Sequence, residues 1–151
     1  MKYSKEMKKI LMILVAGLMS LSIFAQNAVN SDVLRRADVM PVFQNCEDER
    51  FADYPYRCTI MQLMAHFDSA VQLTNVVGAQ TKAHLKFVVE KDGSVSNVDL
   101  VRGVVVNDSS IAQQLDAGII SVANQLEFQS AGQQDGEAVR VQVEFSVSLN
   151  Y

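Results

Sequence analysis

The sequence predicts an α+β domain in which two helices pack on one face of a three-stranded antiparallel sheet. Three observations support this prediction: an Asp-Gly turn between two strand-like runs, two apolar stripes at helical spacing, and a long alternating strand near the end of the chain. Their order along the chain is helix, hairpin, helix, strand. Because each element has a single apolar face, the economical arrangement buries all of these faces in one core.

The first helix is expected to begin near Thr59, because Thr59 and Gln62 have the spacing of a capping box. Its apolar residues recur every three or four positions: Ile60, Leu63, Met64, Phe67 and Val71. The second helix is expected over residues 110–126, where Ser110 and Gln113 have the same spacing. Its stripe consists of Ile111, Leu115, Ile119, Val122 and Leu126.

Three strands are expected, at residues 83–90, 95–102 and 139–149. The first two are joined by a tight turn at Asp92-Gly93, a dipeptide typical of hairpins. Residues 130–136 are polar and contain glycine, which predicts a loop. The last strand alternates polar residues with apolar ones, which are Val139, Val141, Val143, Phe145, Val147 and Leu149.

The N-terminal residues have the pattern of a secretory signal peptide. Four lysines precede an apolar run over residues 10–24, and Ala25 offers a small residue for cleavage. The run is shorter than the roughly 20 residues that span a bilayer, which disfavours the alternative of an uncleaved anchor. No cysteine follows it at which a lipid could be attached. The prediction is a periplasmic protein with a signal peptide at 1–25, a lead at 26–40 and one domain at 41–151.

Composition excludes several classes of partner. The whole chain has a formal charge of −4; without residues 1–25 it keeps 9 basic and 16 acidic residues, a formal charge of −7. Binding to nucleic acid or to an anionic membrane surface requires clustered Lys and Arg. Neither partner is expected, and no stable membrane anchor is expected after cleavage.

The two cysteines, Cys46 and Cys58, predict a disulfide, because paired cysteines in an oxidising compartment usually form one. The alternative is a metal site that includes His66 and His84. The spacings between these four residues match no zinc pattern, so no metal or other cofactor is expected.

Catalysis is not expected. Neither His66 nor His84 has a nucleophile or an acid at a motif spacing, so both are interpreted as surface or helix-border residues. The acidic run Glu47, Asp48 and Glu49 is interpreted as a solvated loop rather than a carboxylate site. No glycine-rich phosphate loop is present in the sequence.

Several segments together resemble a known family. Residues 87–104 (FVVEKDGSVSNVDLVRGV) resemble the central hairpin of the C-terminal domain of TonB-type proteins from Bacteroidetes-like bacteria. Residues 135–141 (DGEAVRV) are similar to that family's last loop and strand. Residues 41–43, followed by Cys46 and Cys58, are similar to a cysteine-bearing lead of some members. The resemblance extends over residues 41–151 and implies the α+β fold described above.

The resemblance implies a periplasmic module that pairs its sheet edge with a short peptide of an outer-membrane receptor, as part of transport. Full energy transducers also have a membrane anchor and a proline-rich arm, whereas this chain has only two prolines, Pro41 and Pro55. Strand addition would use the last strand. Its candidate residues are Val141, Gln142, Val143, Glu144, Phe145, Ser146 and Val147.

One alternative to this function remains open. The alternative is an accessory or structural envelope protein that transmits no force. Such a protein would bind its partner through an acidic face that includes Glu47, Asp48 and Glu49.

Overall fold

The structure of the protein is a computed structural model that describes residues 32–44, 46, 54–71 and 80–150. The chain divides into the units Met1–Asp32 and Val33–Tyr151, and every helix and strand described here belongs to the second unit. Two groups of predictions concern residues outside the described ones. These are the signal peptide with its cleavage near Ala25, and the acidic run Glu47, Asp48 and Glu49.

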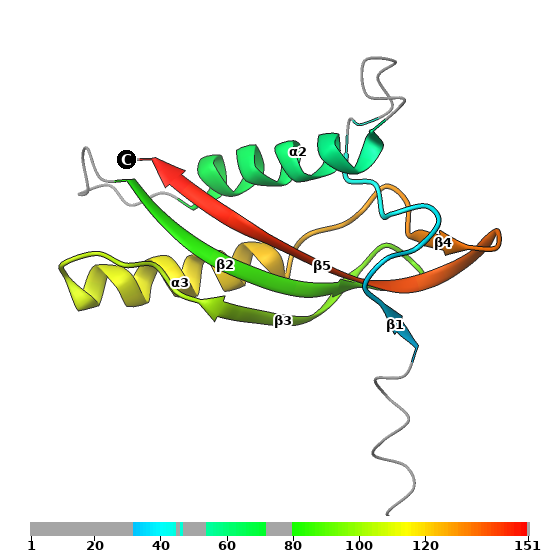
Figure 1. Ribbon diagram of the computed structural model, residues 1–151. Helices are drawn as coiled ribbons and strands as arrows, with labels where there is room; N and C mark the ends of the chain where they lie inside the picture. Colours follow the sequence, from blue (N-terminus) through cyan, green and yellow to red (C-terminus); the bar gives the residue numbers. More distant parts are fainter. Residues whose placement is uncertain (1–31, 45, 47–53, 72–79, 151) are drawn as a thin grey trace, which may run out of the picture. The chain divides into compact units, whose positions relative to one another are not determined.

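Two helices and five strands make up the described part of the second unit (Figure 1). In chain order they are β1 Val33–Leu34, α2 Pro55–Ala70, β2 Gln80–Val89, β3 Val95–Arg102, α3 Ser109–Ala123, β4 Gly132–Gln134 and β5 Glu137–Asn150. The α+β class with two helices is therefore confirmed.

The sheet is larger than predicted and it is mixed. Its strand order is β1-β5-β2-β3, and β4 pairs with the start of β5. β2 pairs antiparallel with both β3 and β5, whereas β1 joins β5 in parallel. The sequence prediction missed β1 and β4. Strands of two and three residues are too short to show an alternating pattern.

Helix α2 begins at Pro55, four positions before the predicted start. Proline suits the first helical turn, because its φ is already helical and the N–H that it lacks would have no partner there. The predicted capping box is wrong, since Thr59 lies inside the helix and is fully buried. Its hydroxyl accepts a hydrogen bond from the Phe43 N–H at 3.0 Å and contacts the Pro41 carbonyl oxygen at 3.4 Å. Thr59 thus holds residues 41–43 against the helix.

Helix α3 is capped by Asp108 rather than by Ser110. The Asp108 carboxylate accepts hydrogen bonds from the backbone N–H groups of Ser110 and Ile111, at 2.8 and 3.2 Å. A carboxylate at this position also interacts favourably with the helix dipole. The helix ends at Ala123, so Leu126 contributes to the core from beyond the helix.

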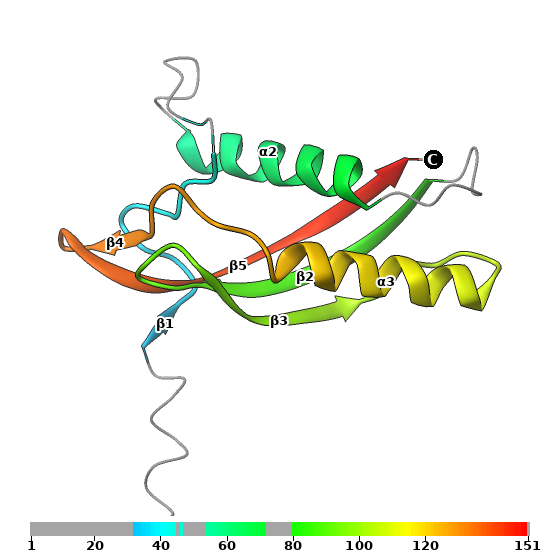
Figure 2. The same cartoon turned by 180° about the vertical axis from the view of Figure 1, so that it is seen from behind.

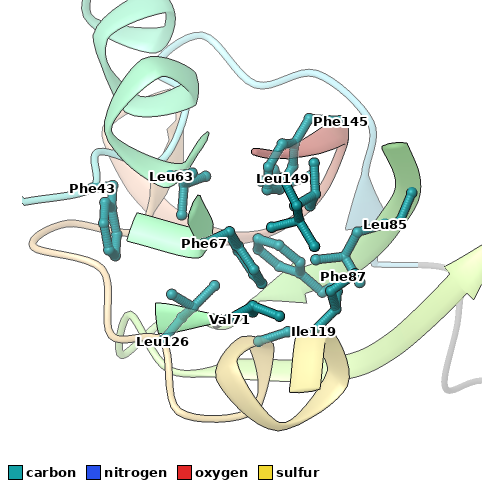
Figure 3. Packing of buried hydrophobic residues seen from close by; sticks show 14 of the residues in the cluster. Phe43, Leu63, Phe67, Val71, Leu85, Phe87, Ile119, Leu126, Phe145 and Leu149 are labelled. Carbon is teal, nitrogen blue, oxygen red and sulfur yellow. The ribbon is translucent and has the colours of Figure 1, made fainter. Parts of the chain in front are cut away.

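Both helices pack on the same face of the sheet, as predicted, and one cluster of buried side chains lies between the layers (Figure 3). α2 contributes Leu63 and Phe67, and α3 contributes Leu115 and Ile119. The sheet side of the core consists of the inward-facing residues of β2 and β5, which are Ala83, Leu85, Phe87, Val89, Val143, Phe145, Val147 and Leu149.

Two tight turns connect neighbouring strands. The predicted turn between β2 and β3 is present, and Gly93 adopts a φ of +86° in it. The predicted loop over residues 130–136 contains β4, which turns into β5 through Asp135 (φ +52°) and Gly136 (φ +79°). Residues at positive φ in a two-residue connection match the right-handed twist of a hairpin.

The predicted disulfide between Cys46 and Cys58 is confirmed. The Cα atoms of the two residues are 5.6 Å apart, which is the usual separation for a bridge, and both residues are buried. Cys58 lies in the first turn of α2, so the disulfide joins the segment before α2 to the start of this helix.

Candidate functional site: an open strand edge

Within the described residues, β5 has partner strands on both sides only near its beginning. β1 pairs with Arg140 and Val141 on one side, and β2 pairs with residues 141–150 on the other. β4 pairs with residues 137–139, before the pairing with β2 begins. From Val143 to Leu149, no strand in the described part of the chain pairs with the side away from β2. We call this stretch the open edge.

Hydrogen bonds at the ends of the strands show which backbone groups point toward the open side. The Glu90 N–H donates to the Ser94 carbonyl oxygen at 2.8 Å, toward β3. Successive residues of a strand direct their backbone groups to opposite sides. The odd-numbered residues of β2 therefore face β5, and by the observed register they pair with the odd-numbered residues of β5.

The outward groups of the open edge therefore belong to Glu144, Ser146 and Ser148. The far end of β5 agrees with this assignment, because the Asn150 N–H donates to the Asp68 carboxylate of α2 at 2.9 Å. The open edge thus lies between β1 at one end and Asp68 at the other. Its backbone donors and acceptors are presented in a regular row.

The residues predicted to bind a partner separate into two groups. Val141, Val143, Phe145 and Val147 are buried, and their backbone groups face β2, so they hold the strand in the sheet. Gln142, Glu144 and Ser146 have their side chains on the outer face. Of these, Gln142 adjoins the residue that pairs with β1. Ser148 was missed, although the alternation of the sequence already placed it in the outward set.

The opposite edge of the sheet is less regular. Among the described strands, β3 pairs with β2 alone, and two register shifts interrupt that pairing. Asn97, in the middle of β3, has a φ of +50°. Bulges and left-handed residues twist an edge away from an incoming strand and break its row of backbone groups. The open edge of β5 is therefore a better template for an added strand than the edge of β3.

Helix α2 runs alongside β5, and both end at the same end of the sheet (Figures 1 and 2). Met61, Met64 and Asp68 recur at spacings of three and four and so lie on one side of the helix. Asp68 reaches the end of β5, so this side of α2 flanks the open edge. Met64 packs against the core, but Met61 is 52% exposed. Methionine side chains adapt readily to different apolar partners.

Hydrogen bonds lower the pKa values of two carboxylates on the outer face. The His84 ring nitrogen lies 2.7 Å from the Glu144 carboxylate, and this hydrogen bond lowers the pKa of Glu144. The Arg140 guanidinium forms two hydrogen bonds with Glu90, at 2.7 and 2.9 Å, which lower the pKa of Glu90. Burial opposes the second shift but does not cancel it.

The Glu90–Arg140 pair predicts a component of stability that depends on pH. Since folding lowers the pKa of Glu90, the pair stabilises the fold fully above the ordinary value of 4.5. This contribution is lost as the pH falls through the lower pKa of the folded state. We expect Glu90→Gln to reduce the free energy of unfolding by about 1 kcal/mol at pH 7 and to flatten its decline below about pH 4.5.

Urea unfolding between about pH 3 and 7 measures this effect. Glu137→Gln is the matched control, because it removes the same charge from an exposed position at the start of β5, the strand that carries Arg140. Equal pH profiles for the two variants would contradict the role assigned to the Glu90–Arg140 pair.

The two histidines do not converge on a reactive site. The His66 ring makes an edge contact with Phe43, with ring centroids 5.7 Å apart, and His84 lies on the outer face of the sheet beside Glu144. Within residues 32–44, 46, 54–71 and 80–150, no three His, Cys, Asp or Glu side chains are grouped so that they could hold a metal ion. Over the same residues, no helix combines the length and apolar character needed to cross a membrane.

Comparison of the chain with protein-family models, with curated proteins and with solved structures finds no match. The open edge is therefore interpreted from its own geometry.

Proposed function

We propose that this protein is an exported binding module that captures an extended peptide by strand addition along the open edge. One observation carries the proposal: the outward backbone groups of Glu144, Ser146 and Ser148 form a regular row with no strand against it in the described part of the chain. Such a row is a template for another strand. The ends of the row are already occupied by β1 and Asp68, which limits where a peptide would lie.

The surroundings of the open edge support the same function. A peptide paired with β5 would direct alternate side chains toward α2, where Met61 and Met64 offer an adaptable apolar surface. Its other side chains would lie beside Glu144 and Ser146 on the polar outer face. This arrangement favours a peptide in which apolar and polar residues alternate.

The resemblance to TonB-type C-terminal domains suggests a source for the peptide. That family pairs a sheet edge with a short segment of an outer-membrane receptor, so we propose a periplasmic location and a receptor peptide as the partner. The proposed role is binding in transport rather than transmission of force. The disulfide is compatible with an oxidising compartment.

Proline at position 146 provides a sharp test of strand addition. The Ser146 N–H points away from β2, so Ser146→Pro removes a donor that a partner would need and leaves the hydrogen bonds to β2 in place. We expect it to weaken partner binding by at least about tenfold, because an unpaired acceptor would remain in the interface. Ser146→Ala, which keeps the backbone donor, is expected to bind within about twofold of wild type.

The partner is first captured from an envelope extract with the immobilised mature domain and is identified by mass spectrometry. Its binding to each variant is then measured by calorimetry, and hydrogen exchange reports protection of the amides of residues 144, 146 and 148. Each variant must first show a cooperative thermal transition. Normal binding by folded Ser146→Pro, together with loss of binding on charge reversal of Glu47, Asp48 and Glu49, would replace strand addition with the acidic-face alternative.

A further inference from the structure

A cavity of about 490 Å³ opens on the outer face where β2 begins and β3 ends. It lies toward the opposite edge of the sheet from β1, and Ser146 is the one lining residue that it shares with the open edge. The residues that line it include Lys82 and His84 of β2, Val101 and Arg102 of β3, Val105 and Ser146. Its volume is within the range of small-molecule sites.

Strand register explains how the polar residues of the cavity come together. His84 of β2 is paired with Arg102 of β3 on one side and with Ser146 of β5 on the other. These three residues therefore form one row across the sheet. Lys82 lies two positions before His84, on the same face, and adds a second cation to the same end of the sheet.

Lys82 and Arg102 differ from the other charged side chains of the outer face in having no carboxylate partner among the described residues. Lys86 pairs with Asp99 at 2.9 Å, and Glu144 bonds with His84. Lys82 and Arg102 are exposed, and no carboxylate of the described residues pairs with either of them. In a chain whose formal charge is −4, the cavity is thus a local concentration of positive charge.

Apolar side chains stand next to these cations. Val101 is 52% exposed and Val105 is 71% exposed, although neither valine gains by contact with water. The position of Val105 is fixed, because its N–H donates to the Thr81 hydroxyl at 3.3 Å and the same hydroxyl lies 3.4 Å from its carbonyl oxygen. The neighbouring Val104 N–H is held by the Asp116 carboxylate at 2.9 Å. The wall of the cavity is therefore ordered before any ligand arrives.

We propose that this cavity binds a carboxylate attached to a short aliphatic group. Arg102 and Lys82 hold the carboxylate, since guanidinium and ammonium groups form their strongest hydrogen bonds with anions. Val101 and Val105 cover the aliphatic part and remove it from water. None of these four residues belongs to the open edge, so the proposal stands or falls independently of strand addition. A free carboxylic acid and the C-terminal residue of a peptide share this chemistry.

Titration of the ¹⁵N-labelled mature domain with hexanoate, followed by NMR, tests the proposal. We expect saturable shifts confined to the amides of residues 81–84, 101–105 and 146, with a dissociation constant of about 1 mM or tighter. The double variant Lys82→Gln, Arg102→Gln should bind at least about tenfold more weakly. Lys91→Gln is the matched control, because it removes an exposed lysine from the turn at the other end of β2, and it should bind as wild type does.

Two further ligands separate the parts of the proposal. Acetate should bind at least about fivefold more weakly than hexanoate, and Val105→Ser should reduce that difference. A valine-ending peptide with a free carboxylate, compared with its amide, distinguishes the two sources. If the peptide with a free carboxylate binds and its amide does not, the ligand can be a peptide terminus. If hexanoate binds and the peptide with a free carboxylate does not, the ligand is a free carboxylic acid. The proposal is overturned if hexanoate gives no saturable shift, if acetate binds equally well, or if the double variant binds normally.

Discussion

Replacement of both cysteines by alanine is expected to lower the free energy of unfolding by about 3 kcal/mol. The bridge between Cys46 and Cys58 closes a loop with a sequence separation of 12, which restricts the unfolded chain. It also keeps the segment before α2 in position beside this helix. Phe43 lies in that segment, is 5% exposed and packs against Phe128 in the core. Without the bridge, this segment would be held by the hydrogen bonds of Thr59 and by the backbone hydrogen bonds of Val39 and Val42 with residues 129–133.

Thermal denaturation measures the effect, and the melting temperature should fall by about 10 °C. Wild-type protein with and without reductant is the control, because its side chains at 46 and 58 are otherwise unchanged. Mass spectrometry of protein alkylated during isolation from the soluble envelope fraction tests the bridge and the proposed location together. Two free thiols would contradict the disulfide, and full-length protein in the membrane fraction would contradict export with cleavage.

Replacement of Gly93 by alanine is expected to cost about 3 kcal/mol, from two separate causes. The φ of +86° costs any residue with a Cβ about 1 kcal/mol. In addition, a Cβ at this position would lie 2.6 Å from the carbonyl oxygen of Phe128. Relief of that contact would move either the turn or the backbone of Phe128, whose N–H donates to the Gly93 carbonyl oxygen at 2.9 Å. Displacements of this kind in a packed region cost about 1–3 kcal/mol.

Gly136→Ala separates the two causes. Gly136 has a similar φ of +79°, but nothing lies within 4 Å of the position that a Cβ would occupy. Its replacement should therefore cost only about 1 kcal/mol. Urea unfolding of both variants gives the difference, which is the contribution of the contact with Phe128. Equal losses would mean that the backbone at Phe128 adjusts freely.

The sequence predicted correctly those elements that are specified by residues close together in the chain. The Asp-Gly turn placed the hairpin, and the alternation of the last strand identified the side chains that are buried. The capping residues were misplaced because Thr59 bonds with the distant Pro41 and Phe43, and because Asp108 is a better acceptor than Ser110. No pattern within one segment reveals such competition.

The candidate site depends still more on distant parts of the chain. The seven residues of the predicted binding strand were chosen as a continuous segment, but strand geometry divides them between the core and the outer face. Which side of β5 is open depends on its pairing with β2 and on the addition of β1 from the lead. The basic cavity combines residues of β2, β3 and β5, so it becomes visible only when the register of the sheet is known.

The position of β5 in the sheet also affects how the domain folds. β5 is the last of the described elements along the chain, yet it is the strand to which β1, β2 and β4 are all paired. Val33 and Arg140, which are neighbours in the sheet, are separated by more than a hundred positions. Contacts across such long loops form late, because the chain must first lose the entropy of closing them. A growing chain could form the β2–β3 hairpin and both helices, but it could not complete the sheet until residues 137–150 were available, so the domain reaches its native state only after synthesis of its last strand.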